Sequence, residues 1–187
     1  MSKRPQDTSA EEPDGGNPHI RFRGGPRQGD RPGLLNSTTD RIERKILLKA
    51  PIGRVWRALS DAKEFGDWFG VDFKGKAFVA GKSVQGRITY PGYEHIVMEV
   101  FIERVVPERL LSWRWHPAAI DPAVDYSQEP TTLVVFELEE GDGGVWLSVV
   151  ESGFDGVPPA RRATAYRMNS SGWDGQMKNI EKHVATP

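Results

Sequence analysis

The longest regular pattern of the sequence lies near its end, from Pro159 to Ala185. Large apolar side chains recur there at intervals of three and four residues, which is typical of a helix with one buried stripe. At 1.5 Å per residue such a helix would be about 40 Å long, so we expect it to lie across a sheet and bury its stripe there. The stripe consists of Tyr166, Trp173, Met177, Ile180 and Val184, with Asn169 on the same face.

Shorter patterns precede this helix. Residues 41–49 alternate between apolar and charged side chains, which predicts a half-buried strand. Two short helices are expected next. Pro51 opens the first, and Asp61 caps the second with Glu64 three residues on, as in a capping box. Their apolar faces consist of Ile52, Val55, Trp56 and Leu59 in the first helix and of Phe65, Trp68 and Phe69 in the second.

From Val71 onward the period of the apolar residues becomes two. Strands are therefore predicted at residues 72–79, 83–90, 96–106, 110–116, 131–139 and 145–151. Short turns rich in glycine and proline separate most of them and imply antiparallel neighbours. The exception, residues 117–130, is too long for a hairpin, and loops of this length often form lids or rims of functional sites. Strands segregated from helices indicate an α+β domain.

The first 39 residues differ in composition from the rest. They are rich in proline, glycine and charge and contain few large apolar side chains. This composition predicts a disordered N-terminal tail, residues 1–39, ahead of a single domain, residues 40–187. Four arginines in the tail leave open a partner-binding arm, namely Arg21, Arg23, Arg27 and Arg31.

Charge and composition argue against several classes of function. The net charge of −1 and the sequence pI of about 6.4 give no electrostatic footprint for nucleic acid. No apolar run reaches membrane-spanning length, and the N-terminus has no secretory apolar region. We therefore expect a cytoplasmic protein with no membrane or nucleic-acid partner. The absence of cysteine removes disulfides, thiolate metal sites and cysteine nucleophiles.

Motifs for catalysis or cofactor binding are weak. Gly81-Lys82-Ser83 looks like the end of a phosphate-binding loop, but Lys76 stands where that loop needs a glycine, and a strand follows. No nucleophile elbow is present. No metal-binding spacing occurs among the histidines, which are His19, His95, His116 and His183. We predict no cofactor and no metal, assign no catalytic residue, and favour binding over catalysis.

One glutamate and one glycine can each be interpreted in more than one way. Val145, Leu147 and Val149 share one side of the last strand, and continuing by twos puts Glu151 on that inner side. An inward carboxylate at a strand end is paired, at the rim or functional. We favour an ion pair at the rim, with an acid or base role as the alternative. Gly172 inside the long helix favours close approach of the sheet, with a kink as the alternative.

Local sequence features add a family resemblance. They are Ala50-Pro51 with Val55-Trp56; Asp61-Ala62 with Phe65, Trp68 and Phe69; Pro107-Glu108-Arg109-Leu110 leading to Ser112-Trp113; and Glu151-Ser152-Gly153-Phe154 followed by Asn169 and Gly172-Trp173. With the order of elements, they resemble the helix-grip (START-like, SRPBCC, Bet v-like) superfamily, a curved antiparallel sheet of about seven strands around a long C-terminal helix. The last set is similar to bacterial single-domain members of the branch named after the activator of heat-shock-protein-90 ATPase. The resemblance covers residues 41–184.

The resemblance implies a cavity between sheet and helix that holds a small apolar or aromatic molecule. Binding of such a ligand is our leading hypothesis, and a chaperone-regulating interaction module or a cavity enzyme of cyclase or hydrolase type are the alternatives. A filled core is the other interpretation of the same inward side chains. His116 and Arg87 are further polar candidates. The predicted cavity residues are Trp68, Phe69, Tyr90, Met98, Trp113, Trp115, Phe136, Glu151, Met168 and Trp173.

Overall fold

Seven strands form one antiparallel sheet in the computed structural model of the protein, which describes residues 40–185. The order across the sheet is β1-β7-β6-β5-β4-β3-β2, so consecutive strands from β2 to β7 are neighbours and the first strand pairs with the last. This confirms the predicted α+β class and strand number. The strands are β1 Arg41–Leu48, β2 Val71–Asp72, β3 Ser83–Ile88, β4 Val97–Val106, β5 Leu110–Trp115, β6 Thr132–Gly141 and β7 Gly144–Ser152.

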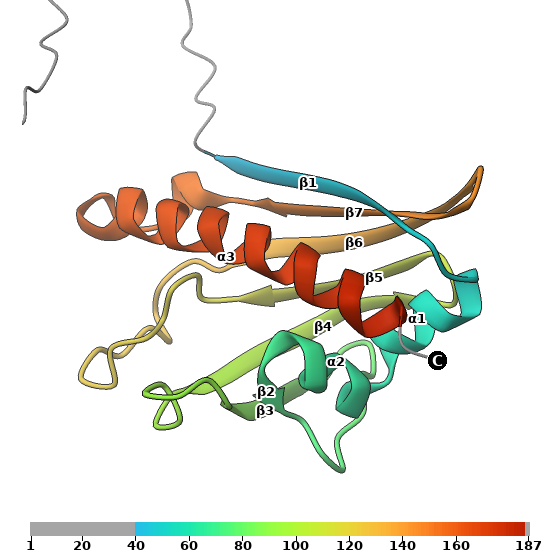
Figure 1. Cartoon of the computed structure of the whole chain (residues 1–187). Helices are drawn as coiled ribbons and strands as arrows, with labels where there is room; N and C mark the ends of the chain where they lie inside the picture. Colours follow the sequence, from blue (N-terminus) through green and yellow to red (C-terminus); the bar gives the residue numbers. More distant parts are fainter. Residues whose placement is uncertain (1–39, 186–187) are drawn as a thin grey trace, which may run out of the picture. The chain divides into compact units, whose positions relative to one another are not determined.

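The long helix α3, Pro159–Ala185, crosses one face of the sheet as its pattern predicts (Figure 1). Its stripe residues Trp173, Met177, Ile180 and Val184 are buried against the sheet and the two short helices. Tyr166, nearer the start, is half-buried and its hydroxyl donates to the backbone oxygen of Arg41, 3.2 Å away. A short 3₁₀ turn, Phe154–Gly156, joins β7 to this helix.

The two short helices are α1, Ile52–Ser60, and α2, Ala62–Phe69. Asp61 caps α2 as predicted, because its carboxylate accepts from the Glu64 backbone N–H at 2.8 Å. The Glu64 side chain does not complete the capping box. It accepts instead from Arg54 and Arg57 of α1, at 2.8 and 2.6 Å, and lies 3.2 Å from His183 Nε2. This cluster ties α1 and α2 to the end of α3.

The strand predicted at residues 72–79 is wrong for most of its length. Only Val71 and Asp72 pair with β3, and residues 73–79 form an irregular loop. The Asp72 carboxylate accepts from the Lys74 backbone N–H at 3.0 Å, and Gly75 has a φ of +73°, so the chain turns directly after β2. Phe73 and Phe78 still point into the core. Their burial produces an apolar pattern without strand pairing.

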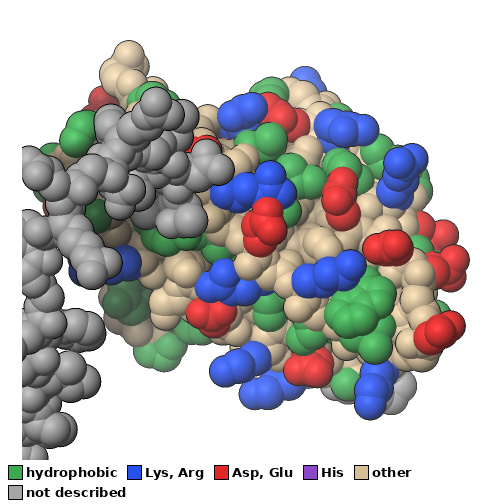
Figure 2. Space-filling model, turned by 90° about the horizontal axis from the view of Figure 1, so that it is seen from above, with side chains coloured by type: hydrophobic (Ala, Val, Ile, Leu, Met, Phe, Trp, Pro, Cys, Tyr) green, Lys and Arg blue, Asp and Glu red, His purple; other side chains and the backbone are tan. Residues whose placement is uncertain are grey.

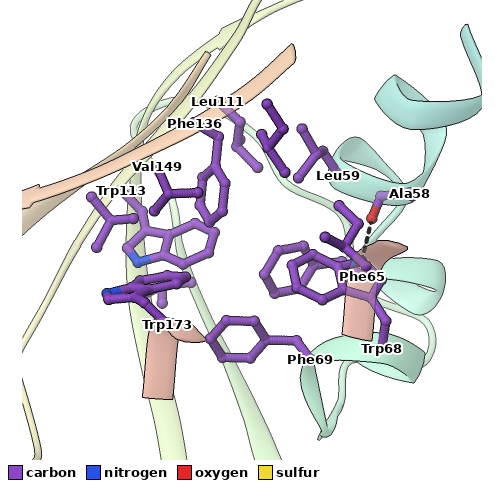
Figure 3. Packing of buried hydrophobic residues seen from close by; sticks show 14 of the residues in the cluster. Ala58, Leu59, Phe65, Trp68, Phe69, Leu111, Trp113, Phe136, Val149 and Trp173 are labelled. Carbon is purple, nitrogen blue, oxygen red and sulfur yellow. Dashed lines mark hydrogen bonds between the residues drawn. The ribbon is translucent and has the colours of Figure 1, made fainter. Parts of the chain in front are cut away.

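An aromatic cluster fills the core between α2 and the middle of the sheet (Figure 3). Phe65 lies at its centre, with ring centroids 4.6 Å from Trp68 and 5.3 Å from Trp113. The Trp68 indole N–H donates to the Ala58 backbone oxygen at 2.8 Å, which satisfies its polar atom inside the core. Edge-on contacts dominate this cluster, the geometry that aromatic rings prefer.

Residues 1–39, predicted as a disordered tail, and residues 186–187 lie outside the described part of the chain. Within residues 40–185, no helix is both long enough and apolar enough to cross a membrane.

Candidate functional site

A cavity of about 650 Å³ lies between the sheet, α3 and the loop of residues 116–131 that joins β5 to β6. Figure 1 places this loop at the end of the sheet opposite α1. The volume falls in the range of small-molecule pockets, roughly 300–1,000 Å³. Six of the predicted cavity residues line it, namely Phe69, Tyr90, Met98, Trp115, Met168 and Trp173.

The other four predicted residues do not line the cavity. Trp68, Trp113 and Phe136 belong to the packed core, where the rings of Trp113 and Phe136 lie 4.8 Å apart. The Trp113 indole N–H has no hydrogen-bond acceptor among the described residues. Glu151 lies behind the cavity wall and is 0% exposed. Two tryptophans of one strand, Trp113 and Trp115, thus divide between core and cavity.

Glu151 organises one wall of the cavity. Its Oε1 accepts from the Trp115 indole N–H at 2.8 Å and from the Thr132 hydroxyl at 2.7 Å. Its Oε2 accepts from the Trp173 indole N–H at 2.7 Å, and Asn169 Nδ2 donates to both oxygens at 2.9 and 3.1 Å. Burial of a carboxylate is costly unless donors surround it. These donors, from β5, β6 and α3, offset that cost and fix the three cavity residues among them.

The ion pair predicted for Glu151 at the rim is wrong. Among residues 40–185, no lysine, arginine or histidine forms a salt bridge with this carboxylate. Neutral indole, amide and hydroxyl donors take that place, and the group is buried rather than at the rim. The period-two pattern correctly puts Glu151 on the inner face, but its partners come from distant parts of the chain.

The opposite side of the cavity is the β5–β6 loop, and Arg161 in the first turn of α3 holds its two ends. Its Nε donates to Glu129 at 2.7 Å, and its Nη1 donates to the Pro117 backbone oxygen at 2.9 Å. The same guanidinium lies 4.8 Å from the ring centroid of Tyr126. His116 Nε2 lies 3.1 Å from the Glu129 backbone oxygen. The loop predicted as a rim therefore forms a wall of the cavity, and hydrogen bonds from Arg161 and His116 hold it in place.

Several wall residues escaped sequence reasoning. The helical spacing predicts Asn169 on the inner face of α3 but indicates no role for it. It gives no signal for Gln176, whose Nε2 donates to the Phe69 backbone oxygen at 2.8 Å. Loop residues including Asp121, Asp125 and Tyr126 also line the cavity. The length of the loop was their sequence signal. No periodicity shows which side chains of such a loop point inward.

The acidic group at Asp125 is held in its ionised form. The Ser127 backbone N–H is the main cause that lowers the pKa of Asp125, the Ser127 hydroxyl adds to it, and His116 acts in the same direction. His95 and His116 both line the cavity, whereas Arg87 does not. Within residues 40–185, no group of three or more histidine and acidic side chains is arranged to hold a metal ion.

Gly172 does not allow close approach of the sheet, so that expectation is wrong. A Cβ at this position would meet nothing within 4 Å, and α3 is helical without interruption from Pro159 to Ala185. Gly172 instead borders the cavity and also an open groove along the outside of α3. The small residue thus leaves space beside the helix.

Comparison with known proteins identifies the family of this domain. Residues 49–185, from the end of β1 to the end of α3, match the family described as activator of Hsp90 ATPase homolog 1-like protein. The chain belongs to this family. The match covers the short helices, six strands and the long helix that enclose the cavity, and with the sheet topology it confirms the helix-grip fold. No match to this sequence is found among curated proteins.

Solved bacterial structures share the fold of this family member. Protein MLL2253 from Mesorhizobium loti is 23% identical with a TM-score of 0.58, over 78% of this chain and 96% of that one. Protein NE0264 from Nitrosomonas europaea is 18% identical with a TM-score of 0.60, over 80% and 96%. Protein Ms6760 from Mycobacterium smegmatis is 18% identical with a TM-score of 0.60, over 77% and 90%. At these identities the likeness concerns the fold alone.

Proposed function

We propose that this domain binds a small apolar or aromatic molecule in the cavity between α3, the sheet and the β5–β6 loop. The observation that carries the proposal is the cavity itself, about 650 Å³, with aromatic walls at Phe69, Trp115 and Trp173. Pockets of this size with mostly apolar walls and a few placed polar groups are typical ligand sites.

Binding is favoured over catalysis by the state of Glu151. An acid or base must reach a proton of the substrate, but both oxygens of this carboxylate are occupied by donors and the side chain has no exposed surface. Its partners Trp115, Asn169 and Trp173 stand between it and the cavity. We assign Glu151 the role of positioning these three residues, which face the ligand.

A chaperone-regulating contact is the second candidate function, and the family match is the observation that favours it. Figure 2 shows one face of the protein, over which basic and acidic side chains are interspersed. A face of that kind offers no single-sign surface for a strongly charged partner. The cavity, by contrast, is a defined concave site, and we place ligand binding first.

A fluorescence titration with the neutral aromatic probe N-phenyl-1-naphthylamine tests the proposal. Ala119 lines the cavity from the β5–β6 loop, and Ala123 of the same loop does not. The matched variants Ala119→Trp and Ala123→Trp add the same ring inside and outside the site. We expect saturable binding by the unmodified protein and by Ala123→Trp, and at least about tenfold weaker binding by Ala119→Trp, because the added ring occupies ligand space.

The outcomes separate clearly. Equal affinity of both variants would place the probe elsewhere on the protein and overturn the cavity proposal. Absence of saturable binding by the unmodified chain would do the same, and would move attention to the chaperone-regulating contact, which a binding assay with a heat-shock-protein ATPase addresses directly.

A further inference from the structure

Three residues of the cavity wall direct their hydrogen-bond donors to Glu151 and not into the cavity, namely Trp115, Asn169 and Trp173. The indole N–H groups of Trp115 and Trp173 both point to Glu151. The amide nitrogen of Asn169 also faces Glu151 and donates to both of its oxygens, at 2.9 and 3.1 Å. The polar atom that Asn169 can offer to the cavity is therefore its carbonyl oxygen Oδ1, an acceptor.

Two more wall residues use a donor for contacts within the protein. Gln176 donates one of its two Nε2 hydrogens to the Phe69 backbone oxygen, and its Oε1 accepts from Asn179 Nδ2 at 3.1 Å. The partner of His116 Nε2 is the backbone oxygen of Glu129, which can only accept, so Nε2 carries a hydrogen; in the neutral form of the ring Nδ1 is then an acceptor. Hydroxyl groups, which can donate or accept, remain at Tyr90, Tyr126 and Ser127.

The acidic side chains at the loop wall of the cavity are Asp121 and Asp125, and no lysine or arginine among the described residues lines it. The other titratable side chains there are His95 and His116. Glu99 also borders the cavity, but its side chain lies on the exposed face of β4. Arg161, which lies against the ring of Tyr126, is paired with Glu129 at 2.6 Å. A ligand carboxylate would therefore find few donors and neither lysine nor arginine here. It would lose its hydration without replacement, which is costly for a charged group.

We infer that the cavity selects an aromatic molecule bearing a protonated amine over one bearing a carboxylate. This inference rests on the proposed function and specifies its ligand class. The ammonium group donates to acceptors such as Asn169 Oδ1 and the Asp125 carboxylate, and charge-assisted hydrogen bonds of this kind are the strong ones. The faces of Trp115 and Trp173 attract a cation as well as an apolar ring.

Displacement of N-phenyl-1-naphthylamine by a matched set of ligands tests the inference. The set keeps one ring system and changes one group: 2-naphthylmethylamine, 2-naphthylmethanol and 2-naphthoate. At about pH 8 an aliphatic amine is protonated and an ordinary imidazole is neutral. We expect the amine to displace the probe at a concentration about tenfold or more below that needed by the carboxylate, with the alcohol between them.

Two variants connect the preference to the cavity. Asp125→Asn removes one lining charge while its side-chain oxygen can still accept from the Ser127 backbone N–H. Asp142→Asn removes one charge from the β6–β7 turn, outside the cavity. We expect Asp125→Asn to reduce the ratio of amine to carboxylate affinity several-fold and Asp142→Asn to leave that ratio unchanged.

Displacement by the carboxylate at concentrations equal to or below those of the amine would overturn the inference and leave the proposed function standing. If none of the three compounds displaces the bound probe, the inference would also be overturned, and the proposed function would still stand. An equal effect of both variants would assign the preference to net charge and reject the cavity as its source. Failure of the probe itself to bind would remove the proposed function and the inference together.

Discussion

Replacement of Glu151 by glutamine tests how much the buried carboxylate contributes to the fold. Glutamine keeps the size of the side chain but has one acceptor oxygen and one donating NH₂ group. If its oxygen takes the place of Oε1, its NH₂ faces the indole N–H of Trp173, which is only 2% exposed. A buried donor without a partner costs about 1–3 kcal/mol, and hydrogen bonds to a neutral acceptor are roughly half as strong as those to a charged one. We therefore expect Glu151→Gln to lose about 3 kcal/mol of unfolding free energy.

Urea unfolding followed by far-ultraviolet circular dichroism measures this loss, because tryptophan fluorescence would itself change when two indole contacts change. Glu137→Gln is the matched control, since Glu137 is an exposed glutamate of β6. It should stay within about 0.5 kcal/mol of the unmodified protein. A loss below about 1 kcal/mol for Glu151→Gln, with an unchanged urea dependence, would refute the view that these donors depend on the carboxylate.

Two further predictions concern charge and backbone space. Burial acts to raise the pKa of Glu64, but the hydrogen bond with His183 and the two neighbouring arginines lower it below its ordinary 4.5. Its stabilising contribution is complete above that value and is lost as the pH falls through the lowered pKa, so Glu64→Gln should flatten the acid-side loss of unfolding free energy. Gly66→Ala should cost about 2–3 kcal/mol, because its Cβ would lie 2.1 Å from the Val71 backbone oxygen. Gly175→Ala, with nothing within 4 Å, should gain about 0.5–1 kcal/mol in urea unfolding.

Periodicity predicted those parts of the fold that depend on local burial. The stripe of α3 and the alternation of six strands depend on which side of each element meets the core, and side-chain spacing records that directly. Residues 73–79 show where this fails. Phe73 and Phe78 are buried like strand residues, but Gly75 and the Asp72 turn stop the pairing. Apolar spacing reports burial, and strand pairing needs a neighbouring backbone as well.

The division between core and cavity was beyond the sequence. Trp113 and Trp115 share one face of β5, yet Trp113 meets the ring of Phe65 from α2, whereas Trp115 lies beside Trp173 of α3 and borders the cavity. Their difference is set by which helix covers each point of the strand. That property depends on tertiary contacts between segments separated by tens of residues, and no local pattern carries it.

A cavity inside a packed domain persists only if its walls resist collapse, because closing the space would recover contacts between apolar atoms. In this fold two sets of hydrogen bonds supply that resistance. Glu151 holds Trp115 and Trp173 at fixed positions on one side, and Arg161 holds both ends of the β5–β6 loop on the other. Each uses charge-assisted hydrogen bonds, which depend on direction as well as distance. The same hydrogen bonds to Glu151 use the donors of Trp115, Asn169 and Trp173, so the contacts that hold the cavity open also determine which polar atoms these three residues present to it.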